Sequence, residues 1–183
     1  MKWKIVVDSS CDLRELTFAH TEEIGFAVVS LKIIVGEREF VDEKGLDTVE
    51  MLEVMENHHG KTSSSAPNAG EWKKAFADGE NVFAITISGA LSGSAAGAHT
   101  ARHLLEQEGI NKNIKIIDSL STGPEMTLYV EKLVEYIEQG LSFEEVSAKI
   151  DKYAKNVRLL YVLESLDNLI KNGRVSKLEG GLA

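Results

Sequence analysis

The feature that most constrains the fold is a nearly unbroken apolar run, Val82-Phe83-Ala84-Ile85, which leads into hydroxyl-bearing residues and then an alanine-rich segment. A run of this length and composition is what a strand buried on both faces requires. Shorter β-branched runs at 4–7 and 114–117 each end at an aspartate followed by a serine. Because such strands alternate with helical segments, the sequence predicts an α/β fold, a layered α/β/α sandwich around a mostly parallel sheet.

The remaining elements follow from periodicity and from capping signals. One longer strand is expected from Phe26 to Ile34, turning at Gly36 into a hairpin with residues 38–41. Residues 61–70 contain consecutive serines and a proline, so we expect an irregular loop there. A strand at 158–163 and a short helix at 166–171 close the chain. Helices are expected at 47–57, 72–76, 94–108, 124–137 and 142–153.

Composition excludes several classes of protein. The 183 residues carry 20 Lys+Arg against 29 Asp+Glu, a net charge of −9, which argues against a general nucleic-acid binder. The single cysteine, Cys11, excludes a disulfide framework and a cysteine-rich zinc site. Since no apolar run reaches membrane-spanning length, we expect no stable membrane insertion. The first residues do not resemble a signal peptide, which makes the cytoplasm the expected location.

Three of the expected strands end in loops that bear hydroxyl groups: 8–10, 88–94 and 118–119. In an open parallel sheet, ligands bind where the strands end at their carboxyl edge. The loop 88–94 opens directly into a helix, whose N–H groups and positive end favour an anion. Serines and glycines also cap helices and form turns without any ligand, so these loops alone leave both interpretations open.

Known catalytic and metal-binding signatures are missing. The sequence has no phosphate-binding loop of the G-x-x-x-x-G-K-[ST] type and no G-x-G-x-x-G after the first strand. Ser92 has an alanine where a nucleophile elbow requires glycine, so a hydrolase is not supported. His99 and His103 lie four residues apart, as in a zinc-binding helix, but no glutamate follows His99. This favours a solvated helix face over a metal site. We therefore expect no catalytic residues, no metal and no cofactor.

Six motifs in order resemble the DegV family of bacterial fatty-acid-binding proteins over essentially the whole chain. The aspartate-serine loop Asp8–Leu13 opens the series, and Val28–Ile33 follows. The others are Ser64-Ser65-Ala66-Pro67 with Gly70-Glu71-Trp72, Leu91-Ser92-Gly93-Ser94, Asp118-Ser119 and Gly173-Arg174-Val175-Ser176. Each motif is weak alone, whereas their common order and spacing are specific.

The resemblance implies a lipid carrier rather than an enzyme. One long-chain fatty acid would be the bound ligand, and serine hydroxyls would hold its carboxyl group. A separate fatty acid kinase subunit would then convert the acid to an acyl-phosphate. Matched position by position, the carboxylate-binding residues are Ser64, Ser65, Ser92, Gly93, Ser94 and Arg174. We also expect Ser64 and Ser92 to approach each other at the carboxyl edge of one sheet.

The family implies a division into residues 1–156, an α/β domain, and 157–183, the start of a second α/β domain that relatives continue. We therefore expect the apolar residues near the end of the chain to be exposed, and this form to bind fatty acid more weakly than an extended one. Two other functions stay open. One is a binder or enzyme of a small phosphorylated metabolite that uses the Ser88–Ser94 anion loop, and the other is an interaction domain with no ligand.

Overall fold

The computed structural model describes residues 2–160, 162–163, 169–170 and 173. The chain divides into two compact units, the first formed by Met1–Leu31 with Ala66–Leu159, the second by Lys32–Ser65 with Leu160–Ala183. The separation of residues 32–65 from their neighbours in sequence was not predicted. The predicted boundary at residue 156 stays a prediction, because most residues beyond it lie outside the described ones.

The first unit is built on a four-stranded parallel sheet with the order β2-β1-β6-β7. Its central strands, β1 (Trp3–Asp8) and β6 (Asn81–Thr86), are buried along nearly their whole length, as the apolar runs predict. The edge strands are β2 (Ile24–Val29) and β7 (Asn113–Asp118). This sheet confirms the α/β class.

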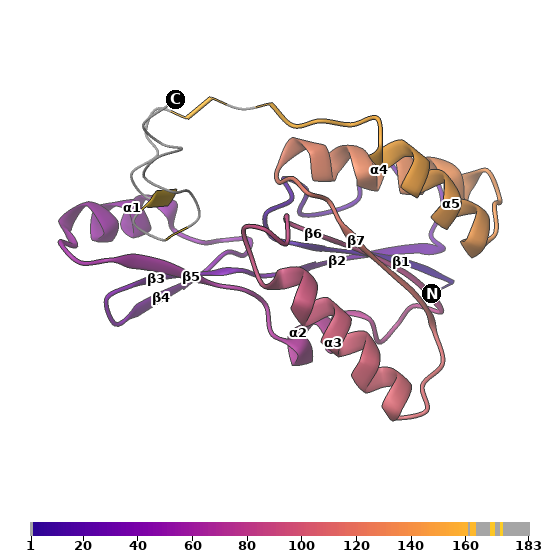
Figure 1. Ribbon diagram of the computed structural model, residues 1–183, viewed down its shortest axis with the longest axis horizontal. Helices are drawn as coiled ribbons and strands as arrows, with labels where there is room; N and C mark the ends of the chain where they lie inside the picture. The colour runs from indigo at the N-terminus through magenta and orange to yellow at the C-terminus, as the bar shows by residue number, and fades with distance from the viewer. Residues whose placement is uncertain (1, 161, 164–168, 171–172, 174–183) are drawn as a thin grey trace. The chain divides into compact units, whose positions relative to one another are not determined.

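Helices cover both faces of the parallel sheet (Figure 1). α4 (Pro124–Glu138) and α5 (Phe143–Ala154) lie on one face, and α2 (Ala69–Ala75) and α3 (Ser94–Gln107) lie on the other. None of the helices in the described part of the chain is long and apolar enough to cross a membrane.

Alternate residues of the central strands point to opposite faces and so belong to two separate cores. Phe83 and Ile85 pack on the α4–α5 side with residues such as Leu133. Val82 and Ala84 pack with the α2–α3 side, where Trp72 and Phe76 are the largest side chains. Burial on both faces explains why β6 needs an apolar residue at nearly every position.

The second unit contains a three-stranded antiparallel sheet with the order β4-β3-β5 and the helix α1. Asp47 caps α1 by accepting the Glu50 N–H at 2.9 Å, as its spacing predicts. The side chains of α1 are half-buried or exposed. The elements are β3 (Lys32–Val35), β4 (Arg38–Val41), α1 (Thr48–Asn57) and β5 (Thr62–Ser65).

The prediction of one strand from Phe26 to Ile34 is wrong. β2 pairs in parallel with β1, whereas β3 pairs antiparallel with β4 and β5. The strand breaks between them because the Leu31 N–H donates to the Ser9 hydroxyl (2.9 Å) rather than to a neighbouring strand. Hydrophobicity continues across this break, so periodicity alone does not reveal it.

Two further expectations need correction. Residues 62–65 are not an irregular loop but form β5, because the backbone of β3 provides hydrogen bonds that outweigh the low strand propensity of serine. The strand expected at 158–163 is absent from its described residues, 158–160 and 162–163, which pair with no neighbouring strand. Of the helix expected at 166–171, only Leu169 and Ile170 are described, and both are helical.

Candidate functional site

The loops that follow β1, β6 and β7 meet at the carboxyl edge of the parallel sheet. The Ser88 N–H donates to the Ser121 carbonyl at 2.8 Å, and the Gly123 N–H donates to the Ser10 carbonyl at 2.9 Å. Parallel pairing brings these loops together, because every strand of the sheet ends at the same edge. The structure thus confirms that the hydroxyl-bearing loops of the first unit gather at one edge.

Asp8, the last residue of β1, lies at the centre of this edge and is fully buried. Its Oδ1 accepts the N–H of Ser10 (3.2 Å) and the Ser10 hydroxyl (2.5 Å). Its Oδ2 accepts the N–H of Ile87 (2.8 Å) and the Ser94 hydroxyl (2.6 Å). These donors offset the cost of removing a carboxylate from water. The sequence indicated Asp8 only as part of a polar loop and did not reveal this role.

The turn Ser92-Gly93-Ser94 leads into α3 beside this carboxylate. The Ser92 N–H donates to the Ser88 carbonyl (3.1 Å), and the Ser92 hydroxyl oxygen accepts the Ser94 N–H (3.3 Å). Within the described part of the chain, the Ser92 hydroxyl proton has no acceptor. Ser92 therefore has a donor available for a ligand, whereas the hydroxyl proton of Ser94 is used by Asp8.

The helices α3 and α4, which begin at the carboxyl edge of the parallel sheet, differ from the other helices in how their first turns are capped. α1, α2 and α5 are capped by the side chains of Asp47, Asn68 and Ser142. Gly93 and Gly123 are the N-cap residues of α3 and α4, and neither helix has a side-chain cap. The first N–H groups of a helix need partners, and an anion is a suitable one. At α4, Pro124 has no N–H and the Met126 N–H donates to the Gly123 carbonyl at 3.0 Å. The start of α3 therefore offers a ligand more than that of α4, although its Ser94 N–H is already bonded to Ser92.

Asp118, at the end of β7, is engaged within the protein. Both of its carboxylate oxygens accept the Gly89 N–H, at 3.1 and 3.2 Å, and Oδ1 also accepts the Leu120 N–H at 3.0 Å. A Cβ added to Gly89 would lie 2.7 Å from Oδ2, so only glycine fits this approach. Leu120 adopts a positive φ of 53° and exposes 78% of its surface. Asp118 thus orders the loops rather than offering a free carboxylate.

The other expected site residues belong to the second unit. Ser64 and Ser65 lie in β5, opposite Ile33 and Lys32 of β3, and Ser64 is exposed whereas Ser65 is half-buried. Ser64 is therefore within a strand of the antiparallel sheet and not in the irregular loop expected at residues 61–70. Its distance from Ser92 stays a prediction. Arg174 lies outside the described residues.

Cys11 is a buried thiol rather than a reactive one. Its side chain is 1% exposed, and burial raises the pKa of the thiol above its usual range. Hydrogen bonds with Leu13 and Thr127 act in the opposite direction and are smaller in effect. A raised pKa reduces the fraction of thiolate, so burial and pKa both favour a structural role for Cys11.

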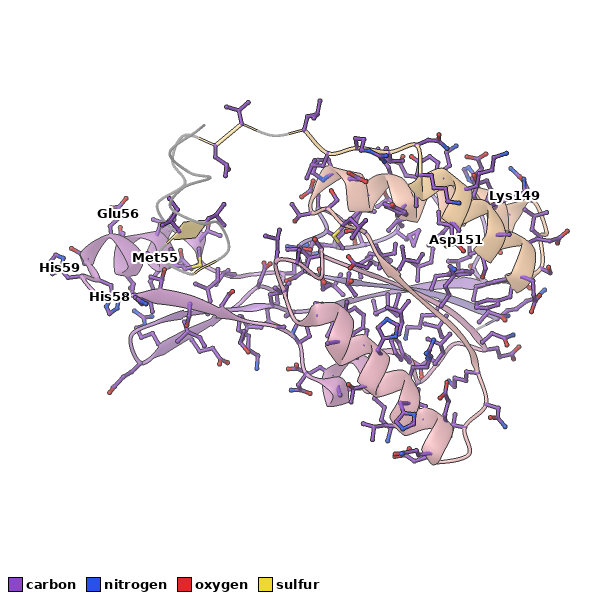
Figure 2. The ribbon with its side chains drawn as sticks, in the orientation of Figure 1. Met55, Glu56, His58, His59, Lys149 and Asp151 are labelled. Atoms are coloured by element: carbon purple, nitrogen blue, oxygen red, sulfur yellow. The ribbon has the colours of Figure 1, made fainter. Side chains whose placement is uncertain are left out.

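The histidines do not form a metal site in the described residues. His99 and His103 are exposed on α3, and His103 lies 3.0 Å from the Gln107 amide. His58 and His59 follow α1 rather than lying on it, as Figure 2 shows at the end of that helix. The half-buried His58 ring lies against Gly36 and Gly60.

The family comparison decides the relationship that the motifs suggested. A family model described as "Uncharacterised protein, DegV family" matches residues 2–183. The chain belongs to the DegV family. A DegV domain-containing protein of Streptococcus pyogenes serotype M1 is 46% identical over 180 residues, which are 98% of this chain and 64% of that protein. The chain therefore spans less than two thirds of the length of this curated DegV relative.

Solved DegV structures share the fold of this chain. The Streptococcus pneumoniae Fatty Acid Kinase (Fak) B3 protein, loaded with linoleic acid, is 42% identical with a TM-score of 0.94. The match covers 100% of this chain and 65% of that one. A DegV family protein from Eubacterium eligens, loaded with heptadecanoic acid, is 38% identical with a TM-score of 0.88, over 98% and 63% of the two chains.

Proposed function

We propose that this chain binds a long-chain fatty acid and takes no part in catalysis itself. The observation that carries the proposal is its close match to the S. pneumoniae protein loaded with linoleic acid. The uncapped start of α3 and the available Ser92 proton support the same conclusion, because a carboxylate needs such donors.

In this proposal the carboxyl group is held by the turn Ser92-Gly93-Ser94, by Ser64 and Ser65, and by Arg174. A carboxylate that leaves water loses hydration, and two or three hydroxyl donors together with a helix start offset much of that cost. The acyl chain supplies the main driving force. Burial of about 0.8 kcal/mol per methylene gives a long chain on the order of 10 kcal/mol before the costs of association.

We propose further that the bound acid is presented to a fatty acid kinase subunit, which forms the acyl-phosphate. Support comes from the name of the S. pneumoniae relative, which places that protein in a fatty acid kinase system. Hydroxyl donors leave the carboxyl group without a permanent covalent or metal partner, as a group that must later react requires.

Mass spectrometry of organic extracts from the purified protein tests the binding proposal. We expect a fatty acid of about equimolar amount, released only when the protein is denatured. Extracts that contain no fatty acid, from protein that also fails to bind an added one, would contradict the proposal. A phosphorylated metabolite in the aqueous extract would instead favour the anion loop as a phosphate site.

A further inference from the structure

Asp8 is a buried carboxylate whose described partners are all uncharged. Two hydroxyl groups and two backbone N–H groups donate to it, and no lysine or arginine in the described residues forms an ion pair with it. A buried carboxylate is costly unless its oxygens are fully hydrogen-bonded. The buried Asp8 carboxylate is therefore stable only while all of its hydrogen-bond donors stay in place.

The carboxylate joins the loop after β1 to two positions that lie far from it in the sequence. Ser10 lies in the loop after β1, Ile87 follows β6, and Ser94 is the first residue of α3. The bonds to Ile87 and Ser94 join residues 79 and 86 positions apart. Of these partners, only Ser94 belongs to the turn that carries the available Ser92 hydroxyl.

The start of α3 is held differently from the start of a helix with an ordinary side-chain cap. A capping side chain such as Ser142 fixes the start of its helix by accepting an N–H of the first turn, so that N–H is no longer available. α3 has glycine at this position and is held by the Ser94 hydroxyl instead, from the side of the sheet. Its start is fixed, and although the Ser94 N–H donates to the Ser92 hydroxyl oxygen, no capping side chain in the described residues accepts an N–H of the first turn beyond it.

We propose that Asp8 is a positioning residue for the ligand-binding turn: through the Ser94 hydroxyl it fixes Ser92 and the first turn of α3 without touching the ligand. This inference rests on the proposed function, since it assigns a role within the same carboxylate site. Within the turn, the inference gives Ser94 the role of holding Ser92 in place rather than of donating to the carboxyl group, because the Ser94 hydroxyl proton is directed to Asp8.

Two matched variants test the inference. Ser94→Ala and Ser10→Ala each remove one hydroxyl donor to Asp8, but only Ser94 connects the carboxylate to the turn. Binding is measured with the fluorescent fatty acid cis-parinaric acid, displaced by linoleic acid, and folding is measured by urea unfolding. We expect Ser94→Ala to weaken binding about 10-fold, because the turn that it no longer holds in place weakens one hydrogen bond to the charged carboxyl group of the ligand. Ser10→Ala is expected to bind within about 2-fold of the parent, with a comparable loss of stability.

Asp8→Asn and the double variant Asp8→Asn/Ser94→Ala add a coupling test. If Asp8 acts through Ser94, the double variant binds no more weakly than the weaker single variant. Equal effects of Ser94→Ala and Ser10→Ala on binding, with binding by the parent intact, would overturn the inference alone. A parent that binds neither probe would overturn the proposed function and the inference with it. Should Asp8→Asn fail to fold, the Ser94 and Ser10 pair still decides.

Discussion

Two glycines near the start of α3 differ in the space that surrounds them. Gly93 has an ordinary φ of −75°, and among the described residues a Cβ at this position would meet only the Ala66 Cβ, at 3.9 Å. Neither backbone conformation nor packing therefore requires glycine here. Gly97, one turn later, is different, because its Cβ would lie 2.7 Å from the Pro67 carbonyl oxygen. Packing therefore requires glycine at position 97, whereas a glycine at position 93 is needed only if a ligand approaches the backbone there.

We predict that Gly93→Ala keeps the unfolding free energy within about 1 kcal/mol of the parent, since alanine also reduces the entropy of the unfolded chain. The same substitution is expected to weaken binding of a fluorescent fatty acid, because its methyl group lies where a carboxylate would approach. Gly97→Ala is the control and should destabilise the protein. Unchanged affinity in a stable Gly93→Ala would show that the turn does not contact the ligand.

Tyr129 gives a prediction for alkaline pH. Burial, followed by the charge of Glu125, raises the pKa of Tyr129 to about 12 from an ordinary value of 10.0. The neutral phenol is therefore favoured in the folded state. Its contribution to stability is complete below pH 10 and is lost as the pH rises to about 12. Tyr129→Phe removes this loss, so the stability difference between parent and variant should change across that interval. Urea unfolding at pH 9 to 12 measures it, and a constant difference would contradict the assignment.

At the scale of secondary structure, the sequence predicted the elements whose signals are local. The strands β1, β6 and β7 and the helices α3, α4 and α5 follow from apolar runs, periodicity and capping residues, which depend only on near neighbours in sequence. The split between β2 and β3 was missed because it depends on the hydroxyl of Ser9, and β5 was missed because its pairing with β3 overrides the propensity of serine.

In the candidate site, too, the features with a local sequence signal were predicted and those that depend on long-range contacts were missed. The turn at Ser92 was predicted, because a serine-glycine loop between an apolar strand and a helix is a local signal. The role of Asp8 was not, because its partners Ile87 and Ser94 come near only after the parallel sheet forms. Long-range contacts of this kind have no local pattern in the sequence.

The capping box at the start of α5 allows a prediction for one element. The Ser142 hydroxyl accepts the Glu145 N–H (3.3 Å), while Glu145 accepts the Ser142 N–H (2.8 Å). Ser142→Ala is expected to lower the unfolding free energy by about 1 kcal/mol. Because α5 buries Val146 and Ile150 in the core of the first unit, urea unfolding of the whole protein reports this loss. Ser142→Asp retains an acceptor and should lose less; equal losses in the two variants would argue against the cap.

For the whole molecule, fatty-acid binding is expected to raise the resistance to heat. A ligand at 100 times its Kd stabilises the folded state by about 2.7 kcal/mol, which for a protein of this size is about 5–10 °C in Tm. Differential scanning fluorimetry with linoleic acid measures the shift. Ser92→Ala should need a higher concentration of the acid to reach the same Tm. A shift that is identical for both proteins at every concentration would mean that Ser92 does not contact the carboxyl group.

The position of β6 beside β1 also affects how the chain is made. β1 leaves the ribosome before β2 and pairs with it soon afterwards, but its other neighbour, β6, is synthesised only after all of residues 32–65 and α2. Until then one side of the most buried strand exposes unpaired backbone groups. Closing so long a loop is slow compared with forming a helix, and it precedes most of the stabilising contacts. In the interval between the synthesis of β1 and that of β6, this unpaired strand edge exposes the nascent chain to aggregation, from which chaperones protect it.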